Sequence, residues 1–363
     1  MANNQRINIP AHHNLYNGDS NRELRIEISF PKTGVNGNTG IAILVPGFGG
    51  DIDSNVYKKM REVFSDKNNL VTVQCAYFGS EFMQSASSFK LNGDEKEFLP
   101  LLSLEERSAL IANSSCLLEI LSTKQLTLPV MAKLEETSDH FNDMGFMQAI
   151  DIITAIEAVK IILKENNMEF NENRVIGYGH SHGAYLLHLS NRLAPHLFSH
   201  IIDNSSWIEP VYLTMNRYLF QSYGKMVLQI EFDYLAKKLI EDINALSLVT
   251  LYNNFNNAAK IISFQGTNDD LVEHSLKANI FQGIEHAELI LVDENRVDHA
   301  IFKSNTHGLN ADFLKMFEYG VNQLGDHENL NAYSNNYEII LSCTKIEVDY
   351  AFGLPVFTRV NFK

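Results

Sequence analysis

The chain has 363 residues, of which 45% are hydrophobic and 20% charged, and its formal net charge is −15. This composition is typical of a globular protein that is long enough to bury a core, in one large α/β domain or two smaller ones. The acidic balance and the lack of a long lysine or arginine run argue against nucleic-acid binding, which normally needs a basic patch.

The cysteines and the apolar segments bear on the compartment. Cys75, Cys116 and Cys343 are far apart and match neither a disulfide framework nor a zinc-type spacing. The first residues lack the basic segment and apolar core of a secretory signal. No continuous apolar stretch reaches the length of about 18 residues that would predict a membrane span. We therefore expect a cytoplasmic protein.

Strand-like and helix-like segments alternate along the chain, which predicts an α/β fold with a mostly parallel sheet and helices on both faces. The first three predicted strands are Glu23–Phe30, a buried run that ends in a glycine turn at Gly40–Gly50, and Leu70–Phe78. The later predicted elements are a helix at 146–164, a strand and helix at 174–193, a strand at 197–206, a strand, loop and helix at 259–280, a strand at 287–294, a helix at 310–324, and a strand-rich tail at 337–362 that forms an edge hairpin or a small appendage.

Two segments interrupt this alternation, within what we expect to be a single domain over residues 1–363. The first, at 79–142, is predicted to be a helical insertion in which Ser103 and Glu106 form a capping box. The second, at 206–257, is rich in aromatic residues and is predicted to be a mostly helical cap over the carboxyl edge of the sheet. An extra core layer is the alternative.

The stretch Gly179-His180-Ser181-His182-Gly183 lies between a predicted strand and a predicted helix. A strand, G-x-S-x-G and a helix form the pattern of a nucleophile elbow, in which the sharp turn leaves little room for flanking side chains. We therefore predict that Ser181 is a nucleophile; a plain strand-to-helix turn is the alternative. His180 and His182 stand two residues apart, as in some zinc sites, but further ligands are missing nearby, so we expect no metal.

A serine nucleophile needs a base, and the base needs an orienting carboxylate. The predicted acid is Asp269, in the pattern Gly266-x-x-Asp269-x-x-Val272 after a strand; Asp270 is the alternative and could instead cap the next helix. The predicted base is His307, which precedes the last long helix; His299 is the alternative.

An oxyanion hole needs two backbone N–H donors. The amides of His182, directly after the serine, and of Phe48, in the loop after an early strand, are the predicted donors, with Gly49 as the alternate. We expect Gly49, His180 and Trp207, the only tryptophan, to shape the substrate pocket. The loop around Phe48 does not match G-x-G-x-x-G, so no dinucleotide cofactor is expected.

Together, the segments PGFGG, GHSHG, GTNDDLV and NTHG resemble those of the α/β-hydrolase superfamily, over about residues 23–324 outside the two interruptions. The resemblance implies an eight-stranded, mostly parallel sheet and a triad of Ser181, Asp269 and His307. Pro46 stands where many members have histidine. More narrowly, GYGHSHGAYLLHLSNRLAPHLF is similar to an uncharacterised bacterial family associated with flagellin-glycosylation loci of Campylobacter relatives, which implies a role on an acylated bacterial sugar.

The expected function is that of a serine hydrolase that works through an acyl-enzyme, as an esterase or O-acyltransferase on an acylated carbohydrate or small ester. The alternatives are a serine peptidase of prolyl-oligopeptidase type and a non-catalytic binding protein with the same fold. The sequence leaves open the substrate, the choice between hydrolysis and transfer, and the oligomeric state.

Overall fold

The computed structural model describes residues 2–94, 97–329, 331 and 334–362. By its internal contacts the chain forms two compact units. The larger unit consists of residues 1–80, 143–211 and 240–363, and the smaller unit consists of residues 81–142 and 212–239. Each of the two predicted interruptions therefore supplies one stretch of the smaller unit.

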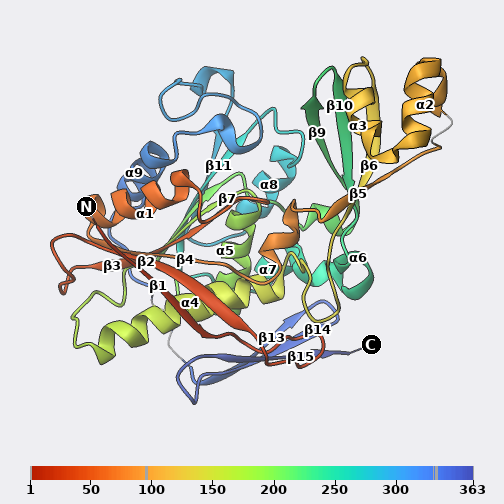
Figure 1. The fold of residues 1–363 in the computed structure, drawn as a ribbon. Coiled ribbons are helices and arrows are strands. Elements are labelled where there is room, and N and C mark those ends of the chain that lie inside the picture. Colours follow the sequence, from red (N-terminus) through yellow and green to blue (C-terminus); the bar gives the residue numbers. More distant parts are fainter. Residues whose placement is uncertain (1, 95–96, 330, 332–333, 363) are drawn as a thin grey trace. The chain divides into compact units, whose positions relative to one another are not determined.

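An eight-stranded sheet forms the centre of the larger unit, in the order β1-β2-β4-β3-β7-β8-β11-β12 (Figure 1). The strands from β4 to β12 pair in parallel, whereas β2 runs antiparallel to both β1 and β4. This sheet confirms the predicted α/β-hydrolase architecture. Its strands are β1 (Asn3–Pro10), β2 (Glu23–Phe30), β3 (Gly40–Val45), β4 (Leu70–Cys75), β7 (Val175–His180), β8 (His200–Asn204), β11 (Lys260–Gly266) and β12 (Ala287–Val292).

Helices cover both faces of this sheet (Figure 1). On one face, Phe64 of α1 stacks on Phe317 of α9 with ring centroids 4.0 Å apart, above Tyr178 of β7. The preceding residue, Gly177, faces the opposite side, where Leu187 of α5 fills the space, as the two-residue period of a strand requires. The helices of this unit are α1 (Asn55–Asn68), α4 (Phe146–Glu165), α5 (His182–Leu193), α7 (Leu248–Tyr252), α8 (His274–Phe281) and α9 (Phe313–Leu324).

The smaller unit contains a four-stranded sheet in the order β5-β6-β10-β9. The predicted capping box is present, because Ser103 and Glu106 exchange hydrogen bonds at the start of α2. The helices expected after residue 206 are replaced between 217 and 232 by a hairpin, whose tight turn includes Gly224 at φ 63°, a conformation that glycine adopts readily. The elements are β5 (Ser88–Leu91), α2 (Leu104–Ala112), α3 (Leu117–Ser122), β6 (Thr127–Lys133), β9 (Arg217–Tyr223), β10 (Met226–Phe232) and α6 (Ala236–Leu239).

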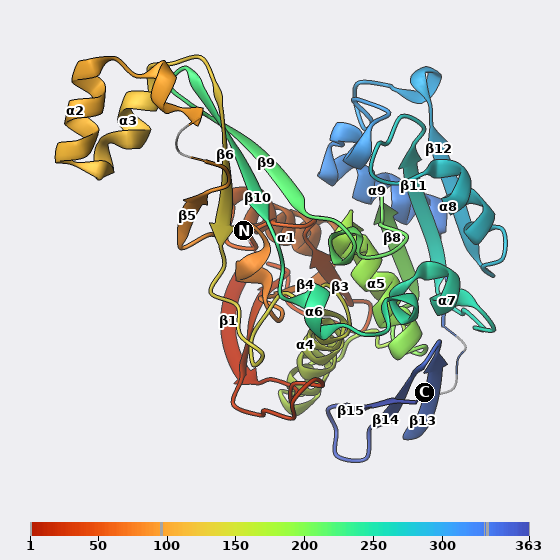
Figure 2. The same ribbon diagram turned by 90° about the vertical axis from the view of Figure 1, so that its right-hand side faces the viewer.

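The tail forms a three-stranded antiparallel sheet of its own, made of β13 (Asn336–Leu341), β14 (Thr344–Asp349) and β15 (Val356–Asn361) (Figure 2). It is the predicted small appendage rather than an edge hairpin. The amide of Phe357 donates to Nε2 of His12 at 2.7 Å, and burial lowers the pKa of His12 to about 4. A neutral imidazole therefore joins the tail to the N-terminal segment.

Within the described residues, no helix is both long enough and apolar enough to cross a bilayer.

Candidate active site

Ser181 occupies the sharp turn between β7 and α5, with φ 52° and ψ −118°. A positive φ is unusual for any residue other than glycine and persists only where the surroundings enforce it. Here the amide of Ser181 donates to the carbonyl of Asn204 at 2.7 Å. A Cβ added at Gly179 would lie 2.6 Å from the amide nitrogen of Ala184, so the chain leaves no space for a side chain there. This geometry is that of the predicted elbow.

Gly183, on the other side of the elbow, packs directly against the end of β3. A Cβ at this position would lie 2.3 Å from the carbonyl oxygens of both Val45 and Pro46. These are backbone atoms at the end of a central strand and in the loop that follows it, so they can move only if the end of β3 moves. Gly183→Ala is therefore expected to lower the free energy of unfolding by about 3 kcal/mol, measured by urea denaturation. Gly37→Ala, where an added Cβ meets nothing within 4 Å, is the control; equal unfolding midpoints for the two variants would contradict this account.

A chain of hydrogen bonds joins the serine to a histidine and a carboxylate. Nε2 of His307 lies 2.7 Å from Oγ of Ser181, and Nδ1 of His307 lies 2.8 Å from Oδ2 of Asp269. Because an ionised carboxylate can only accept, Nδ1 carries the proton and Nε2 is free to accept from the serine hydroxyl. The structure thus brings together the three residues predicted as the triad. The alternative acid, Asp270, is exposed and takes no part in these hydrogen bonds.

The carboxyl group of Asp269 is fully buried and well supplied with donors. Burial by itself would raise its pKa, but the hydrogen bond and charge of His307 oppose this effect. The amides of Leu271 and Val272 also donate to Oδ1, at 2.9 and 3.0 Å. Together these contacts hold the pKa of Asp269 below its ordinary value, so the group is ionised at neutral pH.

His307 is held in place by residues at the end of β8 that the sequence did not single out. The side chain of Asn204 donates to the carbonyl of Gly308 at 3.2 Å, and the amide of Gly308 donates to Oγ of Ser205 at 3.1 Å. The polar run at 203–206, directly after a buried strand, was a signal that could have identified them, because polar residues at the carboxyl ends of parallel strands often line a site.

Three aromatic rings gather beside the nucleophile. The indole of Trp207 lies 4.7 Å from the imidazole of His182 and 5.5 Å from the ring of Phe48, between centroids. Burial lowers the pKa of His182 to about 3, so this imidazole is a neutral member of the group. In the same loop as Phe48, a Cβ added at Gly47 would lie 3.6 Å from Cβ of Ser181. The predicted oxyanion loop therefore lies against the serine, with Phe48 and Gly49 partly exposed.

The remaining candidate histidines, His180 and His299, are not members of the hydrogen-bond series that joins Ser181, His307 and Asp269. His180 packs on the α9 side of the sheet, where its ring centroid is 3.9 Å from that of Phe313, and burial lowers its pKa to about 3. His299, the alternative base, is exposed in the loop after β12. Over the described part of the chain, no group of three or more histidine, cysteine, aspartate or glutamate side chains is placed to hold a metal ion.

Comparison with known proteins agrees with the fold. The acylaminoacyl peptidase of Pyrococcus horikoshii superposes with a TM-score of 0.51 and 11% identity, over 92% of this chain and 43% of the peptidase. This chain thus spans less than half of the peptidase's length. Est1E from Butyrivibrio proteoclasticus, solved with ferulic acid bound, gives a TM-score of 0.46 and 10% identity, over 83% of this chain and 94% of Est1E.

The sheet order, the elbow and the superposition on the peptidase define an α/β-hydrolase fold. More particularly, the chain belongs to the DUF2920 family, described as proteins of unknown function, whose model matches residues 19–233 and thus more than half of the sequence. The matched region includes Ser181 and ends before Asp269 and His307. No curated protein sequence matches the chain significantly.

Proposed function

We propose that this protein is a serine hydrolase that works through an acyl-enzyme, as an esterase or O-acyltransferase. The observation that carries the proposal is the continuous hydrogen-bond chain from Ser181 through His307 to Asp269, with distances of 2.7 and 2.8 Å. A base that accepts from the serine and is itself oriented by a buried carboxylate is the arrangement that activates a hydroxyl nucleophile at neutral pH.

In the proposed reaction, Oγ of Ser181 attacks the ester carbonyl carbon while its proton passes to Nε2 of His307. The oxyanion is stabilised by the amides of Phe48 and His182. The amide of His182 is the first of α5, and the first amides of a helix have no acceptor within the helix. The ester C–O bond then breaks, and the leaving alcohol takes the proton from His307. Water or a sugar hydroxyl next gives its proton to His307 and attacks the acyl carbon. The bond from this carbon to Oγ of Ser181 then breaks, His307 returns the proton to Oγ, and the acid or a new ester leaves.

The proposed substrate is an acylated carbohydrate or another small ester. The ring of Phe48 is partly exposed beside the nucleophile and offers an apolar contact for the acyl group, while the buried rings of His182 and Trp207 pack against Phe48. The carbohydrate part rests on the resemblance of the stretch GYGHSHGAYLLHLSNRLAPHLF to the bacterial glycosylation-associated family. A peptide reporter belongs in the same screen, because a prolyl-oligopeptidase-type peptidase would use the same triad.

The test is covalent labelling by a fluorophosphonate probe, which reacts with activated serines. We expect the wild-type protein to be labelled at Ser181, and both Ser181→Ala and His307→Ala to remain unlabelled because each lacks one partner of the proton transfer. Labelling is read by gel fluorescence, and the site by peptide mass spectrometry. His299→Ala, a change at the exposed alternative base, is the control and should be labelled like wild type. A folded wild-type protein that stays unlabelled would contradict the proposed function and favour a non-catalytic binding protein.

A further inference from the structure

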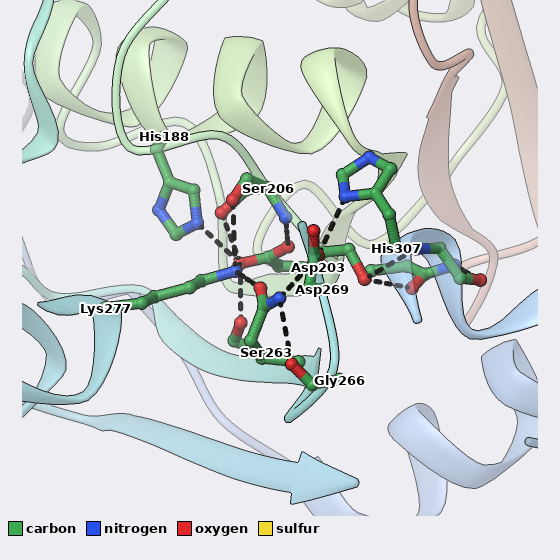
Figure 3. A network of polar contacts seen from close by, with 12 residues as sticks. His188, Asp203, Ser206, Ser263, Gly266, Asp269, Lys277 and His307 are labelled. Carbon is green, nitrogen blue, oxygen red and sulfur yellow. Dashed lines mark hydrogen bonds and ion pairs between the residues drawn. The ribbon is translucent and has the colours of Figure 1, made fainter. Parts of the chain in front are cut away.

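A second buried polar cluster lies beside Asp269 and His307 of the candidate triad (Figure 3). Its centre is Asp203 at the end of β8, whose Oδ2 lies 3.1 Å from Nζ of Lys277 on α8 and 3.1 Å from Nε2 of His188 on α5. All three side chains are fully buried. The hydroxyls of Ser206 and Ser263 also donate to Oδ2 of Asp203, at 2.8 and 2.7 Å. A buried ion pair is costly unless it is fully partnered, and the proposed reaction uses none of these groups directly.

Gln265 on β11 connects this cluster to the triad acid. Nζ of Lys277 donates to Oε1 of Gln265 at 3.2 Å, and Nε2 of Gln265 donates to Oδ2 of Asp269 at 2.6 Å. The direction of the amide is set by its neighbours, because an ammonium group can only donate and a carboxylate can only accept. The opposite orientation would direct the amide NH2 at the ammonium group and Oε1 at the carboxylate. Lys277 therefore fixes which end of Gln265 faces Asp269.

The contacts of Asp269 show what this amide contributes. The backbone amides of Leu271 and Val272 occupy Oδ1, whereas Oδ2 accepts from Gln265 and from Nδ1 of His307. The imidazole changes its charge during the proposed reaction. Gln265 is the partner of Oδ2 that keeps the same charge throughout.

We propose that Gln265 and Lys277 are positioning residues for the triad: the buried ammonium group of Lys277 orients the Gln265 amide, and this amide holds the Asp269 carboxylate toward His307. The inference rests on the proposed function, because it concerns the same triad. It adds two residues that act through Asp269 and touch no reacting atom.

The arrangement has a consequence for pH dependence. The charged or titratable groups that face Gln265 and Lys277 are Asp203 on β8, Asp269 after β11 and, one contact further away, His188 and His307. When either the amide donor or the ammonium charge is lost, the negative charge of Asp269 is less compensated. The protonated form of the neighbouring imidazole then becomes more favourable. Because only the neutral imidazole can accept the serine proton, the acidic limb of the reaction should move to higher pH.

The experiment uses the full chain and the fluorophosphonate probe, with the labelling rate followed against probe concentration and pH. Gln265→Met keeps the length of the side chain but removes the amide, and it leaves Lys277 its contacts with Asp203 and the carbonyl of Ser206. We expect the maximal labelling rate to fall about tenfold, the half-saturating probe concentration to stay within about twofold, and the acidic midpoint to rise by about half a pH unit.

Ser263→Ala is the matched control. It lies two residues earlier on the same strand, is fully buried, and loses its hydrogen bond to Asp203 without touching Gln265. It should lower thermal stability while leaving the labelling rate and its pH midpoint unchanged. If Gln265→Met does not fold, the double variant Lys277→Met/Asp203→Asn removes both charges of the pair and the donor that orients Gln265, and the same fall in the maximal labelling rate is expected.

The outcomes separate this inference from the proposed function. Wild-type rate and pH midpoint in folded Gln265→Met would overturn the positioning role and leave the proposed function intact. An equal loss of rate in Ser263→Ala would also overturn it, because the effect would then follow general stability. An unlabelled wild-type protein would overturn the proposed function, and this inference with it.

Discussion

Asp269→Asn is expected to slow the hydrolysis of p-nitrophenyl acetate by about 10³–10⁴-fold, with the fold retained. The structure gives the physical reason. Nδ1 of His307 donates to Oδ2 of Asp269, so Nε2 is left to accept from Ser181. An asparagine can instead present its NH2 group to the imidazole, which favours the tautomer with the proton on Nε2. That tautomer cannot accept the serine proton.

Asp270→Asn is the matched control for this change. It alters the same kind of side chain in the next residue, which is exposed. We expect its rate to lie within about twofold of wild type, because surface changes away from a network have small effects. Steady-state rates and thermal denaturation of both variants provide the comparison. A large loss in Asp270→Asn with little change in Asp269→Asn would assign the acid to the alternative position.

The residues that the sequence could identify are those whose local chain geometry demands a particular residue type. Gly179 and Gly183 are needed because an added Cβ would meet backbone atoms, and this steric need is visible as the G-x-S-x-G pattern itself. Asp269 and His307 could be placed because each follows a recognisable strand in the order typical of this fold. Their side chains meet in the structure although they are far apart in the sequence.

The positioning residues had no such signal. Lys277 lies in a short helix, where a lysine normally faces solvent, and only the packing of α8 near β8 and β11 buries it. Gln265 lies on a strand that also carries Lys260 and Ser263, so its polar character alone did not single it out. Contacts of this kind depend on which strands become neighbours, and periodicity within one segment does not contain that information. The same limit explains why strand β1 was not predicted. Its side chains are mostly exposed, and its strand conformation depends on backbone pairing with β2.

The hairpin of the smaller unit was missed for a different reason. The aromatic content between 212 and 234 predicts a helical cap, but in β9 Tyr218 and Phe220 lie two residues apart and are both exposed. Their spacing of two matches a strand face. Gly224 between two such runs was the turn signal that favours a hairpin over a helix.

Mild acid is expected to unfold this protein at a pH near 5. Burial is the main cause that lowers the pKa values of His12 and His200 to about 4, and those of His180 and His182 to about 3. The ordinary value is 6.5, so below this pH the unfolded chain takes up protons that the native protein does not. Stability therefore falls as the pH decreases from about 6.5 toward 4.

The expected loss at pH 5 is large compared with ordinary protein stability. It is about 2 kcal/mol for each of the four histidines, or about 8 kcal/mol in total. Asp143 acts in the opposite direction, because burial raises its pKa to about 6. As the pH decreases, Asp143 therefore takes up a proton in the native protein before it does so in the unfolded chain. This offsets about 1 kcal/mol at pH 5. The net loss lies within the whole stability of a typical domain, about 5–15 kcal/mol.

The fluorescence of Trp207 measures this transition directly, because the buried indole is the only tryptophan and lies 4.7 Å from the ring of His182. His12→Gln should move the unfolding midpoint to lower pH by about 0.5 units, because glutamine can still accept from the amide of Phe357 but does not titrate. His299→Asn changes an exposed histidine at φ 56° and should leave the midpoint in place. A native fluorescence spectrum that persists below pH 4 would contradict the burial of neutral imidazoles as the source of acid sensitivity.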